Sequence, residues 1–408
     1  SSSSSSSSRT TNRTSAVPSA RELLTLRGHG TRVYDARVSP DGARIASASG
    51  DNTARLWSAR TGGLVMVLEG HTWPVNGVAF SPCSTRLATA SGDETARIWD
   101  LRTGGVVATL RGHAGPLFSC AFSPDGLAVA TASRDSTARL WHADSGAVKA
   151  VCHGHAAAVS SCAFYPCSTK LVTASGDETV RVWDAAAAAA GGASSASGGP
   201  SSSSSSSSSR TTNRTSAVPS ARELLTLRGH GTRVYDARVS PDGARIASAS
   251  GDNTARLWSA RTGGLVMVLE GHTWPVNGVA FSPCSTRLAT ASGDETARIW
   301  DLRTGGVVAT LRGHAGPLFS CAFSPDGLAV ATASRDSTAR LWHADSGAVK
   351  AVCHGHAAAV SSCAFYPCST KLVTASGDET VRVWDAAAAA AGGASSASGG
   401  PSSSSSSS

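Results

Sequence analysis

The clearest pattern of hydrophobic and polar positions lies in Gly70–Asp100, which reads GHTWPVNGVAFSPCSTRLATASGDETARIWD. Val75–Phe80 is a run of small, branched and aromatic residues. Arg86–Ser91 and Thr95–Trp99 alternate between polar and apolar positions, as half-buried strands do. Turn residues separate these runs, and a Gly-rich turn leads to a fourth run, Val106–Leu110. The pattern predicts four antiparallel strands in about 42 residues.

This unit recurs along the chain with a period of 42 residues. A Gly-His dipeptide begins each unit, an Asp follows the His by 22 residues, and a Trp follows that Asp by 6. One four-stranded unit cannot bury both faces of its sheet, so neighbouring units must stack on one another. A period of this length with four strands is typical of an all-β propeller, in which each sheet is one blade of a ring.

With Gly-His and Trp-Asp at this spacing, the repeats are identified as members of the WD40 family. The resemblance covers Glu22–Asp184 and again Glu223–Asp385. Two units of the first half depart from it, because Trp57-Ser58 and Trp141-His142 stand where the family has Trp-Asp. The resemblance implies an all-β WD40-type propeller built from four-stranded antiparallel blades.

The resemblance also implies a hydrogen-bonded tetrad of His, strand Ser or Thr, Asp and Trp inside each blade. We expect the tetrad hydroxyl to be the one four residues before the Asp, which in the first half belongs to Ser47, Thr89, Thr131 and Thr173. The alternative is the hydroxyl two residues before the Asp, which belongs to Ser49, Ser91, Ser133 and Ser175. The other tetrad positions are His29, Asp51, Trp57, His71, Asp93, Trp99, His113, Asp135, Trp141, His155, Asp177, Trp183, His230, Asp252, Trp258, His272, Asp294, Trp300, His314, Asp336, Trp342, His356, Asp378 and Trp384.

The Ser, His and Asp of each unit also match the residue types of a nucleophilic triad. An enzyme needs one activated nucleophile in one pocket, whereas this set occurs eight times at fixed spacing. The repetition favours a structural role, and we expect neither catalytic residues nor a cofactor.

Partners of WD40 propellers commonly dock on the narrow loop face, at the third and fifth residues after the His and at the residue before the Asp. Aromatic and Arg side chains there are of the types that anchor interfaces, and Trp73 is an additional Trp in the adjacent loop. The resemblance therefore predicts a non-enzymatic scaffold for protein or peptide partners; the alternative is a structural subunit of a larger assembly. The candidate partner-binding residues are Arg32, Tyr34, Trp73, Asn76, Phe118, Arg134, Arg233, Tyr235, Trp274, Asn277, Phe319 and Arg335.

A longer repeat divides the chain into two identical halves, because Arg9–Pro200 recurs as Arg210–Pro401. Repeats 1–4 occupy residues 22–184, and repeats 5–8 occupy residues 223–385. The Ser/Thr-rich segment 1–21 is predicted to be disordered. The Ala-, Gly- and Ser-rich segments 185–222 and 386–408 are predicted to be a flexible linker and a disordered tail.

The eight units can close in two ways, and the resemblance implies that the strand before the first Gly-His completes a last blade. In two four-bladed rings, Glu22–Leu26 and Glu223–Leu227 each seal their own half. In one eight-bladed ring, Glu223–Leu227 completes the blade that ends at Trp183, and Glu22–Leu26 completes the blade that ends at Trp384. Four sheets must be strongly wedge-shaped to meet at an axis, so we expect the single eight-bladed ring.

Composition adds few constraints to this picture. The net charge of +8 is mostly Arg spread over the repeats without a basic cluster interleaved with aromatics, which does not favour nucleic acid. No apolar run approaches the length of about 18 residues that a membrane-spanning helix needs. The ten Cys form no C-x-x-C pair, and Cys152 with His153 is too small a set for a metal site. We therefore expect reduced thiols and a cytoplasmic or nuclear location, and the absence of an initial Met indicates a fragment or a processed chain.

Overall fold

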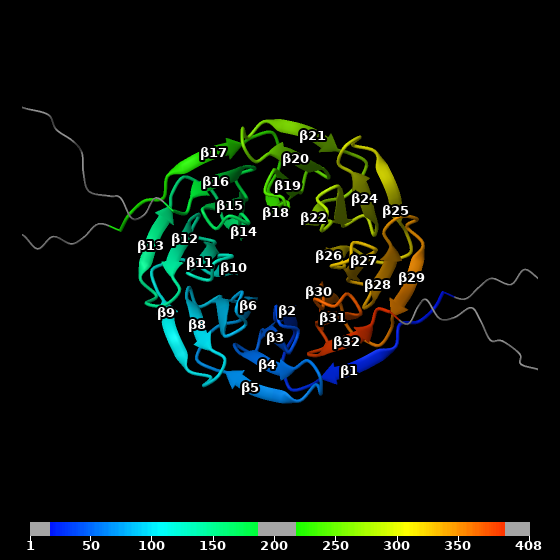
Figure 1. The fold of residues 1–408 in the computed structure, drawn as a ribbon, viewed down its shortest axis with the longest axis horizontal. Helices are drawn as coiled ribbons and strands as arrows, with labels where there is room; N and C mark the ends of the chain where they lie inside the picture. Colours follow the sequence, from blue (N-terminus) through cyan, green and yellow to red (C-terminus); the bar gives the residue numbers. More distant parts are fainter. Residues whose placement is uncertain (1–16, 187–217, 388–408) are drawn as a thin grey trace, which may run out of the picture.

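Eight four-stranded antiparallel sheets stand side by side around a central axis (Figure 1). The computed structural model describes residues 17–186 and 218–387 of the chain. These residues contain strands and no helix, so no helix among them is long and apolar enough to cross a membrane. The predicted all-β propeller is confirmed.

We number the blades in chain order, each from its innermost to its outermost strand. In the first half, blade 1 is β2 (Val33–Val38), β3 (Arg44–Ser49), β4 (Ala54–Ser58) and β5 (Leu64–Leu68); blade 2 is β6 (Val75–Phe80), β7 (Arg86–Ser91), β8 (Ala96–Asp100) and β9 (Val106–Leu110); blade 3 is β10 (Leu117–Phe122), β11 (Ala128–Ser133), β12 (Ala138–His142) and β13 (Val148–Cys152); and blade 4 is β14 (Val159–Phe164), β15 (Lys170–Ser175), β16 (Val180–Asp184) and β17 (Glu223–Leu227). In the second half, blade 5 is β18 (Val234–Val239), β19 (Arg245–Ser250), β20 (Ala255–Ser259) and β21 (Leu265–Leu269); blade 6 is β22 (Val276–Phe281), β23 (Arg287–Ser292), β24 (Ala297–Asp301) and β25 (Val307–Leu311); blade 7 is β26 (Leu318–Phe323), β27 (Ala329–Ser334), β28 (Ala339–His343) and β29 (Val349–Cys353); and blade 8 is β30 (Val360–Phe365), β31 (Lys371–Ser376), β32 (Val381–Asp385) and β1 (Glu22–Leu26).

The ring closes through two strands that cross between the halves. β17, from the second half, pairs with β16 of the first, and β1, from the first half, pairs with β32 of the second. Both pairings have the same register, since Leu227 lies opposite Val180 and Leu26 lies opposite Val381. The single eight-bladed ring is therefore confirmed, and the alternative of two four-bladed rings is wrong.

The hydrophobic core lies between blades rather than inside any one of them. Eight buried clusters occupy the eight interfaces between neighbouring blades. Between blades 1 and 2, for example, Ala46 and Leu56 pack with Val75, Leu87 and Trp99. Both faces of the second strand of each blade are buried as a result, which is why one unit depends on its neighbours.

The ends of the predicted linker belong to the fold. Ala185 is buried, and the backbone of Val151 on β13 exchanges hydrogen bonds of 2.8–2.9 Å with Pro219 and Ala221. The same bonds join Val352 on β29 to Pro18 and Ala20. Ala386, the first residue after β32, is buried as well. The segments predicted as 1–21, 185–222 and 386–408 are thus ordered at these ends, and the rest of each lies outside the described residues. Backbone pairing of small residues on an outer strand leaves little trace in composition.

Candidate functional site

Four side chains form one hydrogen-bonded chain inside blade 2. The indole Nε1 of Trp99 on β8 donates to Thr89 Oγ1 on β7 over 3.0 Å. Thr89 Oγ1 lies 2.7 Å from Nε2 of His71, in the loop that enters the blade, and His71 Nδ1 lies 2.8 Å from Asp93 Oδ2. Since the carboxylate can only accept, Nδ1 carries the proton, and the Thr89 hydroxyl donates to Nε2. The chain therefore ties the entering loop to the β7–β8 turn.

The same arrangement occurs in all eight blades. The His–Asp distances are 2.7–2.9 Å, the His–hydroxyl distances 2.7–2.8 Å and the Trp–hydroxyl distances 2.8–3.0 Å. The hydroxyl four residues before the Asp occupies this position throughout. The hydroxyl two residues before the Asp serves the backbone instead: Ser91 donates to Trp73 O and accepts from Asp93 N.

The tetrads hold their ionisable groups in fixed charge states. Burial by itself raises the pKa of the Asp51 carboxyl, but hydrogen bonds from His29 and Thr53 outweigh it and leave the pKa well below its usual value. Burial lowers the pKa of the His71 imidazole, and the nearby Asp93 only partly offsets this. The tetrad of blade 2 therefore combines an ionised carboxylate with a neutral imidazole near neutral pH.

This geometry does not suit nucleophilic catalysis, although it contains the three residue types of a triad. The hydroxyls of Ser47 and Thr89 are fully buried. Each one already accepts the indole N–H of its Trp and contacts its His ring, so no substrate atom can reach it. What the tetrads can do chemically is hold the loops of one face in place.

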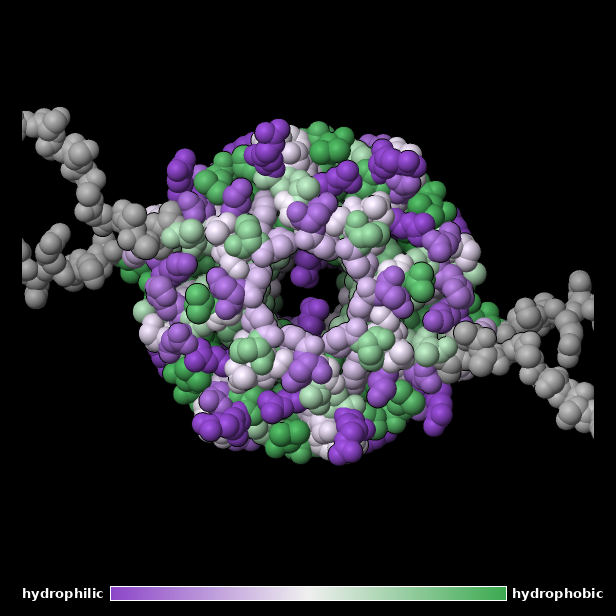
Figure 2. All heavy atoms as spheres, viewed as in Figure 1, coloured by the Kyte–Doolittle hydropathy of each residue, from purple (hydrophilic) through white to green (hydrophobic). Residues whose placement is uncertain are grey.

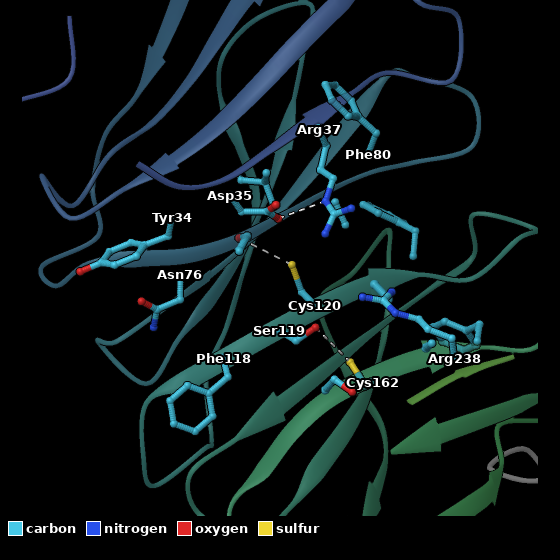
Figure 3. Close-up of a pocket in the computed structure, with 18 of the residues that line it drawn as sticks. Tyr34, Asp35, Arg37, Asn76, Phe80, Phe118, Ser119, Cys120, Cys162 and Arg238 are labelled. Atoms are coloured by element: carbon cyan, nitrogen blue, oxygen red, sulfur yellow. Dashed lines mark hydrogen bonds and ion pairs between the residues drawn. The ribbon is translucent and has the colours of Figure 1, made fainter. Parts of the chain in front are cut away.

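The candidate partner-binding residues lie on that loop face, around the mouth of the central channel. Trp73 is the most exposed of the aromatic ones, at 65%, and Phe118 is also exposed. Tyr34, Asn76 and Phe118 follow one another on blades 1, 2 and 3 and line the channel mouth (Figure 3). The Asn76 side chain donates to Leu117 O over 2.8 Å and so also joins two blades.

The remaining candidates complete this face. Arg32 and Arg134 are exposed, whereas Trp73 stands outside the channel lining, beside Gly92. A Cβ at Gly50 would meet Thr31 Oγ1 at 2.8 Å, and the Tyr34 ring lies at contact distance, 3.5 Å, so glycine leaves room for the Thr31 side chain. The second half repeats the arrangement at opposite blades with Arg233, Tyr235, Trp274, Asn277, Phe319 and Arg335.

The central channel carries charged residues that sequence reasoning missed. Its two halves are cavities of about 560 and 570 Å³, and Figure 2 shows hydrophilic atoms inside the opening. Asp35 and Arg37 on β2, with Asp236 and Arg238 on β18, face this space. The other inner strands have Gly or Ser, and Ala, at the matching positions. This departure of Asp35 and Arg37 from the repeat pattern is the sequence feature that could have pointed to the charged channel.

The described part of the chain contains no cluster of metal-ligating side chains. No group of three His, Cys, Asp or Glu residues there could hold an ion. All ten Cys lie in the described residues and are free thiols, and burial raises the pKa of the Cys162 thiol to about 12.

Two comparisons with known proteins agree with this geometry. A family model described as "WD domain, G-beta repeat" matches eight times, at residues 20–58, 62–100, 104–142, 146–184, 221–259, 263–301, 305–343 and 347–385. Among solved structures, the computationally designed Ika8 protein is similar in fold, with a TM-score of 0.73 and 24% identity over 89% of this chain and 99% of that one.

Proposed function

The chain belongs to the WD40-repeat family, whose propellers generally act as non-enzymatic interaction scaffolds, and we propose that it binds protein or peptide partners on its loop face. The observation that carries this proposal is the exposure of Trp73 and Phe118 on that face. Large aromatic side chains left in water on a rigid frame are typical interface anchors.

The frame beneath these side chains supports the proposal. The tetrads fix each loop from below, so the exposed residues are presented without a large ordering cost on binding. Arg32 and Arg134 add cations beside the aromatic residues, and Arg is itself enriched at interfaces. The opposite half offers the same set, so the disc has two equivalent docking arcs. The free thiols support a cytoplasmic or nuclear location.

The test compares two matched surface variants in affinity purification with quantitative mass spectrometry. The docking variant carries Trp73→Ala, Phe118→Ala, Trp274→Ala and Phe319→Ala. The control carries Leu127→Ala and Leu328→Ala, whose residues are as exposed as Trp73, at 65%, but lie in the turns at the opposite end of the inner strands.

We expect the docking variant to lose partners that the wild type and the control retain, with a nearly unchanged melting temperature. A large loss of stability with an unchanged set of partners would assign these side chains to the fold instead. Co-purification of a fixed set of subunits by every variant would favour the alternative, a structural subunit of a larger assembly.

A further inference from the structure

Two ion pairs face each other across the central channel, on opposite blades 1 and 5. Arg37 Nε donates to Asp35 Oδ2 over 3.2 Å, and Arg238 Nε donates to Asp236 Oδ2 over 3.1 Å. Each carboxylate thus engages only the inner nitrogen of its guanidinium and orients the group. Neither terminal nitrogen, Nη1 or Nη2, of Arg37 or Arg238 has a hydrogen-bond partner among the described residues.

In both pairs the cation, rather than the anion, is exposed to the channel. The side chains of Arg37 and Arg238 are 44% and 45% exposed, whereas those of Asp35 and Asp236 are only 13% and 14% exposed. The second carboxylate oxygen, Oδ1, is buried in both pairs. A ligand in the channel therefore encounters the two guanidinium ends.

Both guanidinium groups reach one shared space. Arg37 and Arg238 each line both halves of the channel, and Figure 3 shows the two side chains directed into the same cavity from different blades. The carboxylate of Asp236, and across the channel that of Asp35, raises the pKa of Arg238. Among the described residues that line the cavities, no further Asp, Glu, Lys or Arg occurs.

The rest of the wall suits a small polar ligand. Gly77, Ser119 and Ser161 take the place of Asp35 on the other blades of the first half, and Ala takes the place of Arg37. Small residues leave the space open, and the Ser hydroxyls can donate hydrogen bonds. The protein walls of the channel also focus the field of a charge that faces this space.

We propose that Arg37 and Arg238 form a clamp for one small polyvalent phosphate anion, of the size of pyrophosphate, in the central channel. The free end of a guanidinium matches two oxygens of a phosphate, which makes such contacts both strong and directional. Two phosphate groups in one ligand can use both clamp residues at once. This site is separate from the loop-face docking surface, and it does not depend on the proposed function.

The experiment is isothermal titration calorimetry of the full chain with sodium pyrophosphate. The clamp variants are Arg37→Gln, Arg238→Gln and the double variant. The control is Arg102→Gln with Arg303→Gln, which removes the same two charges from exposed turns far from the inner strands. We expect one pyrophosphate per chain, a loss of about tenfold in affinity for each single variant, and no measurable binding by the double variant.

Three results would overturn the clamp. Binding of two pyrophosphates per chain would mean that each Arg acts alone. Equal weakening in the control would mean that net charge, not the channel, attracts the anion. Equal affinity of the wild type and the double variant for pyrophosphate, or no detectable binding by the wild type, would exclude the site. Near-ultraviolet circular dichroism checks that every variant keeps the native packing of its Trp residues.

Discussion

Replacing Asp93 by Ala tests the tetrad most directly, because this carboxylate accepts four hydrogen bonds. Oδ2 accepts from His71 Nδ1 and from the backbone of Thr72, and Oδ1 accepts from the backbone and the hydroxyl of Thr95. The Thr72 amide is exposed and can bond to water. The His71 side chain is fully buried and cannot.

The expected loss follows from the sealed donor of His71, with Thr95, which also donates to Asp93, buried beside it. A buried group left without its partner costs about 1–3 kcal/mol. The Thr95 hydroxyl, already 3.5 Å from His71 Nδ1, can rotate towards the ring and recover part of it. We therefore expect Asp93→Ala to lower the free energy of unfolding by about 1–3 kcal/mol, without removing any chemical activity.

The duplicated chain supplies an internal replicate. Asp294 makes the same four contacts in blade 6, on the opposite side of the ring. Asp294→Ala should cost as much as Asp93→Ala, and the double variant should cost their sum, because the sites share no partner. Asp144→Ala is the control: this carboxylate is 74% exposed in its ion pair with Arg86, so its loss should cost no more than about 1 kcal/mol.

Urea unfolding followed by Trp fluorescence measures these differences, since each blade buries one Trp. Equal stability of the wild type and Asp93→Ala would refute the reasoning for that blade. Unequal single variants would show that the two halves are not equivalent in solution, despite their identical sequences.

Three further predictions address closure, pH and thiol chemistry. The half chain Arg9–Ser197 should form a dimer, because its first strand can pair with the last strand of a second copy as β17 pairs with β16. Sedimentation measures its mass, and a monomer that stays folded on dilution would contradict this prediction. Burial lowers the pKa of His71, His113, His272, His314 and His356 below the ordinary value of 6.5, so the unfolded chain binds protons first. Stability should be full above about pH 6.5 and should fall on acidification. It should fall further below about pH 4, where the Asp side chains of the unfolded chain begin to protonate while those of the folded tetrads, whose pKa values are lowered, stay ionised. Melting curves at pH 7.5, 5.5 and 4 check the sign. Hydrogen bonds from Ser81 and Thr85 lower the pKa of the exposed Cys83 to about 7, so iodoacetamide should label Cys83 and Cys284 at pH 7.5 well before the buried Cys162; equal rates would contradict the exposure and the lowered pKa.

The spacing of His, Asp and Trp allowed the tetrads and the propeller to be predicted, because both depend on contacts within one repeat or between identical neighbours. The channel pairs could not be predicted in this way. A bulge separates Val33 from Asp35 in the β2–β3 register, and such an extra residue reverses the alternation of faces along the rest of the strand. The side to which Asp35 and Arg37 point is therefore hidden until the strand is paired.

The number of blades depends on a different kind of information. Because the halves are identical, a four-bladed and an eight-bladed ring would use the same strand pairings and the same residues at nearly every blade interface. No single residue distinguishes them; the difference is the angle between neighbouring blades, an eighth of a circle instead of a quarter. The second strand of each blade is buried on both faces, and its buried residues are Ala, Ser, Thr and medium-sized aliphatic ones, which keep neighbouring sheets close and nearly parallel. The wider quarter-turn would open these interfaces at their outer edge, where Leu68 and Trp99 now pack, and the lost burial opposes the smaller ring.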